Sequence, residues 1–171
     1  MCGIFGITDS ENASFLTYIA LYALQHRGQE SCGIVTYSSS GYRHYNSMGL
    51  VHESFTRDVL DRLDGNYAIG HVRYSTSGSS DITNSQPLFF RTRFGELAVA
   101  HNGNIVNSDS LKEELSQKGS IFQTTTDSEI IAHLVSVSKK KNFIDALCDG
   151  LLRLKGAYSF VFLYGKTIIA V

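Results

Sequence analysis

The sequence opens with MCGIFGI (residues 1–7), an apolar run with a cysteine near its start. A short apolar run of this kind is typical of a buried β-strand, which we expect over residues 3–8. The next strand-like stretches, residues 32–39 and 42–51, meet at Ser-Ser-Gly (39–41) and predict a β-hairpin. The fold therefore begins with a buried strand and a hairpin, a combination that favours antiparallel pairing.

Helices and further strands follow in blocks along the rest of the chain. Helices are expected at residues 14–28, 53–65, 110–119, 126–140 and 142–156, and strands at 66–76, 88–106 and 157–171. Gly95 and Gly165 divide the last two strand regions into pairs. Because hairpins take the place of regular βαβ repeats, the order predicts an α+β fold with helices packed on antiparallel sheets. The final residues, 167–171, have a strand pattern, so we expect residues 1–171 to be one domain cut from a longer protein.

Local sequence patterns indicate the buried side of one expected helix and the starts of two others. The first helix is amphipathic. Its apolar side is formed by Phe15, Leu16, Ile19, Tyr22 and Ala23. The pairs Ser110/Glu113 and Thr126/Glu129 have the spacing of a capping box. The second pair places Asp127 at the first helical position.

Composition limits the possible functions. Hydrophobic residues make up 43 % and charged residues 18 % of the chain, as in an ordinary globular domain. The formal net charge of −1 gives no electrostatic basis for binding nucleic acid or an anionic membrane. No apolar run approaches the roughly 18 residues of a membrane span, and the N-terminus lacks the pattern of a signal peptide. We therefore expect neither nucleic acid nor a membrane as a partner.

The spacing of cysteines and histidines argues against a metal site. Cys2, Cys32 and Cys148 are widely separated and form no zinc or iron–sulfur pattern. The six histidines show no HExxH or similar pairing, so we assign no metal ligand. Reduced thiols are the default in the cytosol, and we expect a cytoplasmic protein.

Cys2 is a candidate nucleophile that carries its own base. Methionine is removed from a new chain when the next residue is small, which would leave Cys2 with both a thiol and an α-amine. The α-amine has a reference pKa of about 7.7–8.0, so a neutral fraction near pH 7 can accept the thiol proton. Nucleophile and base would then lie on one residue. The alternative is a small buried cysteine beside a strand, which is common in proteins.

The pair Asn102-Gly103, within VAHNGNIV, supports two compatible interpretations. Asn-Gly favours a tight type I′ hairpin turn, because both residues accept positive φ. The same pair could form an oxyanion hole from the Asn102 side-chain amide and the Gly103 backbone N–H.

Arg73 and Asp127 could bind the two charged groups of an amino acid. Arg73 lies at a strand end, and its guanidinium can donate two parallel hydrogen bonds to a carboxylate. Asp127 could pair with an ammonium. The alternatives are an arginine on the solvated surface and an acid that interacts with a helix dipole. The polar segment 77–87 after Arg73 suits a lid over a small ligand, or is a plain connection.

Seven segments of the chain occur together, in this order, in one known family. They are MCGIFGI, LQHRGQES, GHVRYST, NSQPL, VAHNGNIVN, TTTDSEI and LKGAYSFV. On these segments the chain resembles the class II glutamine amidotransferases, the N-terminal-nucleophile glutaminases, from Met1 to its last residue. HRGQES is most similar to the glutaminase domain of the amidophosphoribosyltransferase branch, and differs from the aminosugar-synthase and asparagine-synthetase branches.

The resemblance implies a fold and a chemistry. The fold would be a four-layer αββα sandwich with two antiparallel sheets. Cys2 would attack the side-chain amide of L-glutamine, and its α-amine would move the proton. Asn102 and Gly103 would hold the oxyanion, Arg73 would bind the α-carboxylate and Asp127 the α-ammonium. The products would be glutamate and ammonia, formed through a γ-glutamyl thioester.

The resemblance also implies further contacts and partners. Arg27 and Gly28 would line the nucleophile pocket, and the loop 74–79 would close over glutamine with Thr76 as a contact. The family's phosphoribosyltransferase domain does not occur within residues 1–171. It would be the chain's own C-terminal partner and would hold Mg²⁺, and no cofactor is expected in this segment. We expect a homo-oligomer for the full-length protein.

The expected function is the glutaminase half of a glycosyltransferase. The ammonia would be used to make 5-phosphoribosylamine in the first step of de novo purine synthesis. Two alternatives remain open. The domain could serve another acceptor, such as an aminosugar or amino-acid synthase. It could also be a non-catalytic glutamine-binding or assembly module if Met1 is retained.

Overall fold

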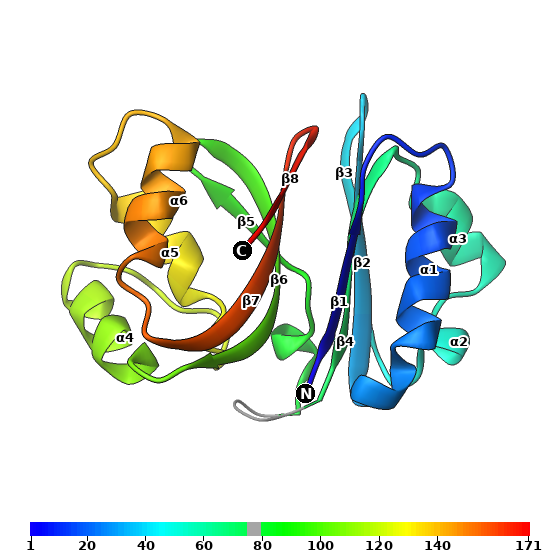
Figure 1. Cartoon of the computed structure of the whole chain (residues 1–171), viewed down its shortest axis with the longest axis horizontal. Coiled ribbons are helices and arrows are strands. Elements are labelled where there is room, and N and C mark those ends of the chain that lie inside the picture. The colour runs from blue at the N-terminus through cyan, green and yellow to red at the C-terminus, as the bar shows by residue number, and fades with distance from the viewer. Residues whose placement is uncertain (75–79) are drawn as a thin grey trace.

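Two antiparallel sheets lie face to face between two layers of helices (Figure 1). The computed structural model describes residues 1–74 and 80–171. One sheet has the strand order β1 (Gly3–Ile7), β4 (Tyr67–Arg73), β2 (Ser31–Ser38), β3 (Gly41–Met48). The other has the order β5 (Leu88–Thr92), β6 (Gly95–Ile105), β7 (Gly156–Tyr164), β8 (Thr167–Ala170). The strand pairings described in both sheets are antiparallel, so the predicted αββα architecture is confirmed.

The helices divide between the two outer layers (Figure 1). The first sheet is covered by α1 (Ala13–Ala23), α2 (Val51–Ser54) and α3 (Arg57–Arg62). The second sheet is covered by α4 (Ser108–Gln117), α5 (Ile130–Val137) and α6 (Phe143–Leu151). Short 3₁₀ turns lie at Gln25–Arg27 and Ile82–Asn84. Over the described residues, none of the helices combines the length and apolarity that a bilayer crossing requires.

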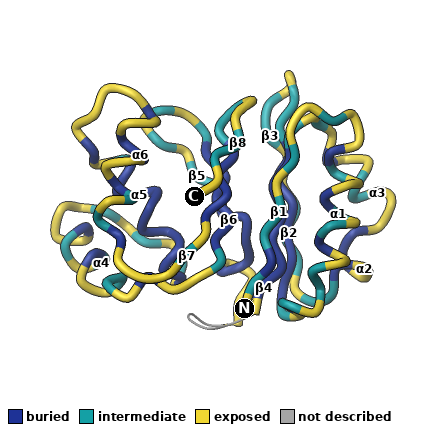
Figure 2. Tube along the Cα trace, viewed as in Figure 1, coloured by how far each residue is buried: buried dark blue, intermediate teal, exposed yellow. Residues whose placement is uncertain are grey.

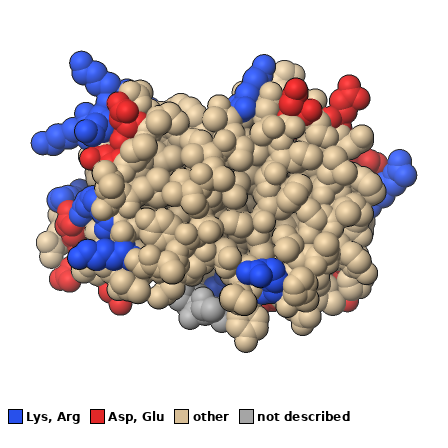
Figure 3. All heavy atoms as spheres, in the orientation of Figure 1, with Lys and Arg blue, Asp and Glu red and all other residues tan. Residues whose placement is uncertain are grey.

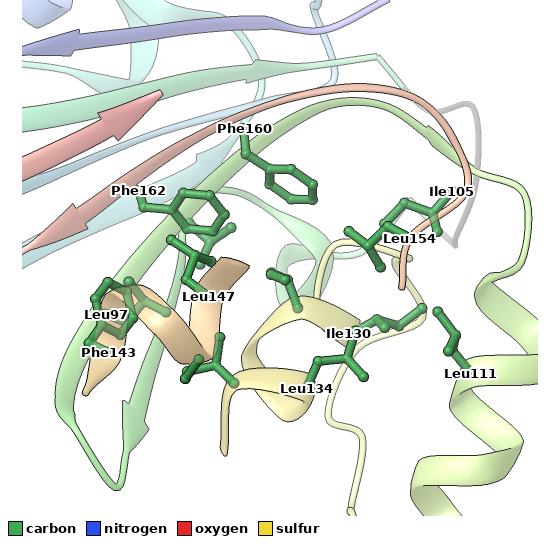
Figure 4. Packing of buried hydrophobic residues seen from close by; sticks show 14 of the residues in the cluster. Leu97, Ile105, Leu111, Ile130, Leu134, Phe143, Leu147, Leu154, Phe160 and Phe162 are labelled. Carbon is green, nitrogen blue, oxygen red and sulfur yellow. The ribbon is translucent and has the colours of Figure 1, made fainter. Parts of the chain in front are cut away.

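Buried apolar side chains hold these layers together, and β2 and β4 are the most continuously buried strands (Figure 2). One cluster fills the space between the second sheet and its helices, where Phe160 and Phe162 of β7 point toward the helices that carry Leu134 and Leu147 (Figure 4). A second cluster lies beneath α1 to α3, and a third lies between the two sheets. On the face shown in Figure 3, acidic and basic side chains are interspersed near the edges and the centre is largely uncharged.

The strand β6 contributes to two of these clusters, because its side chains alternate between the two faces of the sheet. Leu97 and Val99 lie in the cluster beneath the helices, whereas Ala98 and Ala100 lie between the sheets. The alanines take up little space and allow the two sheets to approach closely. The same alternation turns Asn102 toward the first sheet.

The amphipathic pattern of the first helix does not mark its buried face. Ala13, Thr17 and Leu21 of α1 are fully buried, whereas the large side chains of the apolar side are exposed. Those exposed side chains are Phe15, Leu16, Ile19 and Tyr22. The reason lies in β4, where a Cβ on Gly70 would come within 2.6 Å of Thr17 Cγ2. The helix lies so close to the glycine that only its narrow face of smaller residues fits against the strand.

Most expected elements are present with shifted ends. The hairpin turns after β2, β5 and β7 are confirmed. The expected helix 53–65 is divided into α2, which ends at Ser54, and α3. Thr56 caps the start of α3 by accepting from the Val59 N–H at 3.4 Å. The expected helix 14–28 ends at Ala23 and continues as a separate 3₁₀ turn.

The expected Ser110/Glu113 capping box is wrong, because α4 begins two residues before Ser110. Ser110 Oγ donates to the Asn107 carbonyl at 3.0 Å, and Glu113 is exposed. Asn107 is the N-cap residue of α4, but its side chain binds the segment before β7 rather than the helix. Its amide donates to the Arg153 carbonyl at 3.0 Å and accepts from the Lys155 N–H at 2.9 Å.

We expect Leu21→Ala to lower the free energy of unfolding by about 2–5 kcal/mol, because it leaves a cavity under α1. Ile19→Ala, at a position 47 % exposed on the same helix, is the matched control and should cost less than about 1 kcal/mol. Urea unfolding followed by circular dichroism measures both. Equal losses would contradict the assignment of the buried face.

Candidate active site

Cys2 lies just before β1, next to the end of β6 in the opposite sheet. Its backbone N–H donates to Asn102 Oδ1 at 3.1 Å, and its carbonyl accepts from Arg27 Nε at 2.9 Å. Its Sγ lies 3.7 Å from the Tyr74 carbonyl oxygen. Cys2 is therefore held through its main chain on both sides, and the residue remains partly exposed.

Asn102 and Gly103 lie inside β6 rather than at a turn. They pair with Ser159 and Tyr158 of β7, and this pairing continues past them, so the expected type I′ turn is wrong. Gly103 has a φ of +155°, and a Cβ there would lie 2.4 Å from the Ala157 carbonyl oxygen. The glycine is needed because β7 passes too close for any side chain.

The contact with Cys2 determines which way the Asn102 amide points. A backbone N–H can only donate, so the Asn102 atom that faces Cys2 is the carbonyl oxygen. The Nδ2 group of Asn102 then points away from the Cys2 N–H and can donate to another acceptor. Cys2, Asn102 and Gly103 line one hollow, so Asn102 Nδ2 and the Gly103 N–H are candidate donors at this site.

A cavity of about 20 Å³ opens beside Cys2. It is lined by four of the predicted site residues, Cys2, Arg73, Gly103 and Asp127. This volume suits about one water molecule, so an amino acid can enter only when the walls move apart. A second hollow of about 250 Å³ touches Cys2, Asn102 and Gly103.

Arg73 is the last residue of β4 and is only 3 % exposed. Its guanidinium forms an ion pair with Glu30, a residue that the sequence analysis did not assign. Arg73 also lines the cavity beside Cys2. It therefore places a buried positive charge on the wall of that cavity.

Asp127 is buried three residues before α5, so the prediction that it occupies the first helical position is wrong. Its Oδ2 accepts from the Ile105 N–H at 2.9 Å, and its Oδ1 lies 3.5 Å from His101 Nδ1 and 3.4 Å from Ser128 Oγ. Burial raises the pKa of the Asp127 carboxyl, but the interactions with His101 and Ile105 outweigh it and lower the pKa below its ordinary value. The carboxylate is therefore charged at neutral pH.

The expected Thr126/Glu129 capping box is also wrong, because Glu129 bonds to residues further upstream. Its carboxylate accepts from the Gln123 N–H at 2.9 Å and the Thr124 N–H at 2.7 Å, and contacts His133 Nε2 at 3.1 Å. Burial raises the pKa of Glu129, but these hydrogen bonds prevail and lower it to about 2. A charged carboxylate thus holds the segment that carries Asp127.

Arg27 lies beside Cys2, whereas Gly28 packs against the backbone of Arg73. Arg27 binds the Cys2 carbonyl, and a Cβ on Gly28 would lie 2.6 Å from the Arg73 carbonyl carbon. Thr76 and residues 75–79 of the expected closing loop lie outside the described residues.

The sequence of the chain was compared with models of known protein families. A family model described as a glutamine amidotransferase domain matches residues 71–170, which is more than half of the chain. The chain belongs to the glutamine amidotransferase domain family.

Relatives of this glutamine amidotransferase domain are much longer proteins. It is 49 % identical over 170 residues to amidophosphoribosyltransferase 3, chloroplastic, of Arabidopsis thaliana, with 99 % of this chain and 32 % of the relative covered. It is 46 % identical over 161 residues to amidophosphoribosyltransferase of Bacillus subtilis, with 94 % and 34 % covered. The chain thus spans about a third of the length of these relatives.

A solved structure also matches the whole glutamine amidotransferase domain. The glutamine phosphoribosylpyrophosphate amidotransferase from B. subtilis, complexed with ADP and GMP, aligns with a TM-score of 0.92 at 42 % identity. The alignment covers 100 % of this chain and 37 % of that one.

Sequence reasoning missed a group of polar side chains at the cavity of this glutamine amidotransferase domain, of which Gln86, His101 and Ser128 line it. They are His71, Gln86, His101 and Ser128, all buried. Burial lowers the pKa of His71 to about 3, so its neutral ring donates through Nε2 to the His101 carbonyl at 3.0 Å. The sequence did contain one signal for two of these residues. His71 and His101 stand within apolar strand segments, where a polar side chain must be buried and needs a hydrogen-bond partner. Within the described residues, no cluster of His, Cys, Asp or Glu side chains could hold a metal ion.

We expect the Glu129 carboxylate to make stability depend on pH. Its folded pKa of about 2 is below the ordinary value of 4.5, so its contribution is present above about pH 4.5 and is lost as pH falls toward 2. Glu129→Gln should lower the thermal midpoint at pH 7 and lack this acid-dependent loss. Thermal unfolding between pH 2 and pH 7 measures both, with the exposed-site variant Glu113→Gln as control. Parallel profiles for wild type and Glu129→Gln would refute the assignment.

Proposed function

We propose that this glutamine amidotransferase domain hydrolyses the side-chain amide of L-glutamine to glutamate and ammonia, with Cys2 as the nucleophile. The observation that supports it most is that Cys2, held by Asn102 of the opposite sheet, shares one cavity with Gly103, Arg73 and Asp127. A thiol, N–H donors, a cation and a carboxylate are the groups that such a reaction on an amino acid requires.

The base in this proposal is the α-amine of Cys2 after removal of Met1. In the structure this nitrogen belongs to the peptide bond with Met1 and donates to Asn102 Oδ1 at 3.1 Å. Met1 is 73 % exposed and therefore open to an aminopeptidase. The freed amine would keep a hydrogen bond to Asn102 while its lone pair accepts the thiol proton, since its reference pKa is about 7.7–8.0.

The reaction has two steps, in which first the Cys2 thiol and then water adds to the side-chain carbonyl carbon of glutamine. Cys2 Sγ adds to the amide carbon, the thiol proton passes through the α-amine to the leaving nitrogen, and ammonia departs from a γ-glutamyl thioester. Water then adds to the thioester carbonyl, the amine relays its proton to the sulfur, and glutamate leaves. Both additions place negative charge on the carbonyl oxygen, where Asn102 Nδ2 and the Gly103 N–H are the proposed donors. One donor of this kind is worth about 10²–10³ in rate.

Recognition of glutamine uses the charged pair of the cavity. The Arg73 guanidinium would bind the α-carboxylate, and the Asp127 carboxylate would bind the α-ammonium. Arg27 and Gly28 would support the pocket around Cys2. Thr76 is proposed as a further contact.

For the longer protein, we propose an amidophosphoribosyltransferase that makes 5-phosphoribosylamine in the first step of de novo purine synthesis. This is supported by the relatives of the chain, which are amidophosphoribosyltransferases about three times its length. The proposal includes a C-terminal phosphoribosyltransferase domain with its own Mg²⁺ site, no cofactor in residues 1–171, a homo-oligomer and a cytoplasmic location.

Intact mass spectrometry should show loss of Met1 and one covalent adduct after treatment with diazo-oxonorleucine, a glutamine-analogue electrophile. The adduct should map to Cys2 and be blocked by glutamine, because both molecules occupy the same pocket. Cys2→Ser should fold, fail to form the adduct and release no ammonia from glutamine. Retained Met1 with no adduct would support a non-catalytic module instead.

In the full-length protein, Cys2→Ser should abolish 5-phosphoribosylamine formation from glutamine but leave formation from added ammonium salts. The physical reason is that the variant cannot produce ammonia, although the acceptor domain is intact. A coupled assay with phosphoribosyl pyrophosphate measures both activities. Wild-type protein that forms no 5-phosphoribosylamine from either source would favour a different acceptor.

A further inference from the structure

The strand β6 extends beyond its neighbour β5. The last pair between them is Leu88 with Val99, whereas β6 continues to Ile105. In an antiparallel sheet, alternate residues direct their backbone groups to the same side. The residues of β6 that face the missing neighbour are His101, Gly103 and Ile105, which we call the open edge.

Side chains take the place of the missing strand at both ends of the open edge. The His101 N–H donates to Gln86 Oε1 at 2.8 Å, and the Ile105 N–H donates to Asp127 Oδ2 at 2.9 Å. Gly103 lies midway between these two anchored residues. The alternation directs its N–H to the same side, where it lines the cavity next to Cys2.

The geometry determines the orientation of the Gln86 amide. The His101 N–H can only donate, so Oε1 faces it and Nε2 faces Ser128 Oγ at 3.0 Å. Ser128 Oγ also lies 2.8 Å from His101 Nδ1 and 3.4 Å from Asp127 Oδ1. Gln86 itself is 5 % exposed. Both anchors of the open edge are thus joined through Ser128 into one buried network.

We propose that Gln86 is a positioning residue for the oxyanion hole, which holds β6 so that the Gly103 N–H points at the developing oxyanion beside Cys2. The inference rests on the proposed glutaminase function. Gln86 also lines the cavity beside Cys2, but the role assigned to it acts through its bond to the His101 N–H rather than through glutamine. Gln86 would set the direction of the Gly103 N–H. The hydrogen bond from this N–H to the oxyanion becomes strong only in the transition state.

If Gln86 has this role, its loss should lower kcat but leave the affinity for glutamine nearly unchanged. Misdirecting an oxyanion donor weakens an interaction made in the transition state and lowers kcat, whereas ground-state affinity is unchanged. Loss of one donor costs about 10²–10³ in rate, so a misaligned donor should cost about 10- to 100-fold. Arg73 and Asp127, which would bind glutamine itself, lie on other elements. Asp127 reaches the network through Ser128 but is also held by the Ile105 N–H at 2.9 Å, a bond that does not involve Gln86.

The test uses Gln86→Met, which keeps the length of the side chain but removes both hydrogen bonds. In the purified chain, kcat for ammonia release from glutamine should fall about 10- to 100-fold. Glutamine affinity, measured by calorimetry in the unreactive Cys2→Ala background, should change less than about threefold. Hydrogen exchange at the His101 amide should become faster, because its acceptor is gone.

Two further variants separate positioning from general stability. Gln86→Glu retains an acceptor for the His101 N–H and should have a higher kcat than Gln86→Met. Tyr42→Phe removes hydrogen bonds between Tyr42 Oη and the carbonyls of Glu96 and Leu163, away from the cavity. It should lower the thermal midpoint and leave kcat unchanged.

Three results would overturn the assignment. An active wild type with an equally active Gln86→Met shows that Gln86 does not position the donor. Parallel loss of kcat and glutamine affinity shows a merely structural role. A wild-type chain that releases no ammonia and binds no glutamine overturns the proposed function itself, and the role of Gln86 with it, so the two failures are distinguishable.

Discussion

The hydrogen bond from the Cys2 N–H to Asn102 Oδ1 joins the two sheets at the candidate nucleophile. It requires the sheets to lie close together, and the small residues Ala98 and Ala100 on the inner face of β6 make this possible. The bond places the thiol and at the same time turns the Asn102 amide so that its N–H group faces away from Cys2 N. The geometry of the site is thus a consequence of how tightly the inner faces of the sheets pack.

An unpaired strand edge is usually a liability, because its free N–H and C=O groups invite association. Here the edge of β6 beyond β5 is covered by individual side chains rather than by a strand. Gln86 and Asp127 bind the N–H groups on either side of Gly103, and His71 binds the His101 carbonyl. A gap in the ladder leaves a small cavity next to the backbone, which a continuous sheet could not provide.

Buried charges surround this gap, and each has a partner. Arg73 is paired with Glu30, and Asp127 and Glu129 accept backbone N–H bonds. An unpaired charge in such a place would be strongly destabilising, so the partners keep the groups ionised. The same partners restrict the side chains to one orientation, which reduces the ordering needed when an amino acid binds.

The sequence by itself determined the fold class, the hairpins and the main candidate residues, because strand periodicity, turn glycines and the segments around Cys2 and Asp127 are local features. It did not show that Asn-Gly at 102–103 lies in a strand, since that depends on β7 pairing alongside. Nor did it show which face of α1 is buried, which the close approach to Gly70 decides. Gln86 became part of the site only through contacts with His101 and Ser128, distant in the chain. Such roles arise from packing between remote segments, which only the tertiary structure brings together.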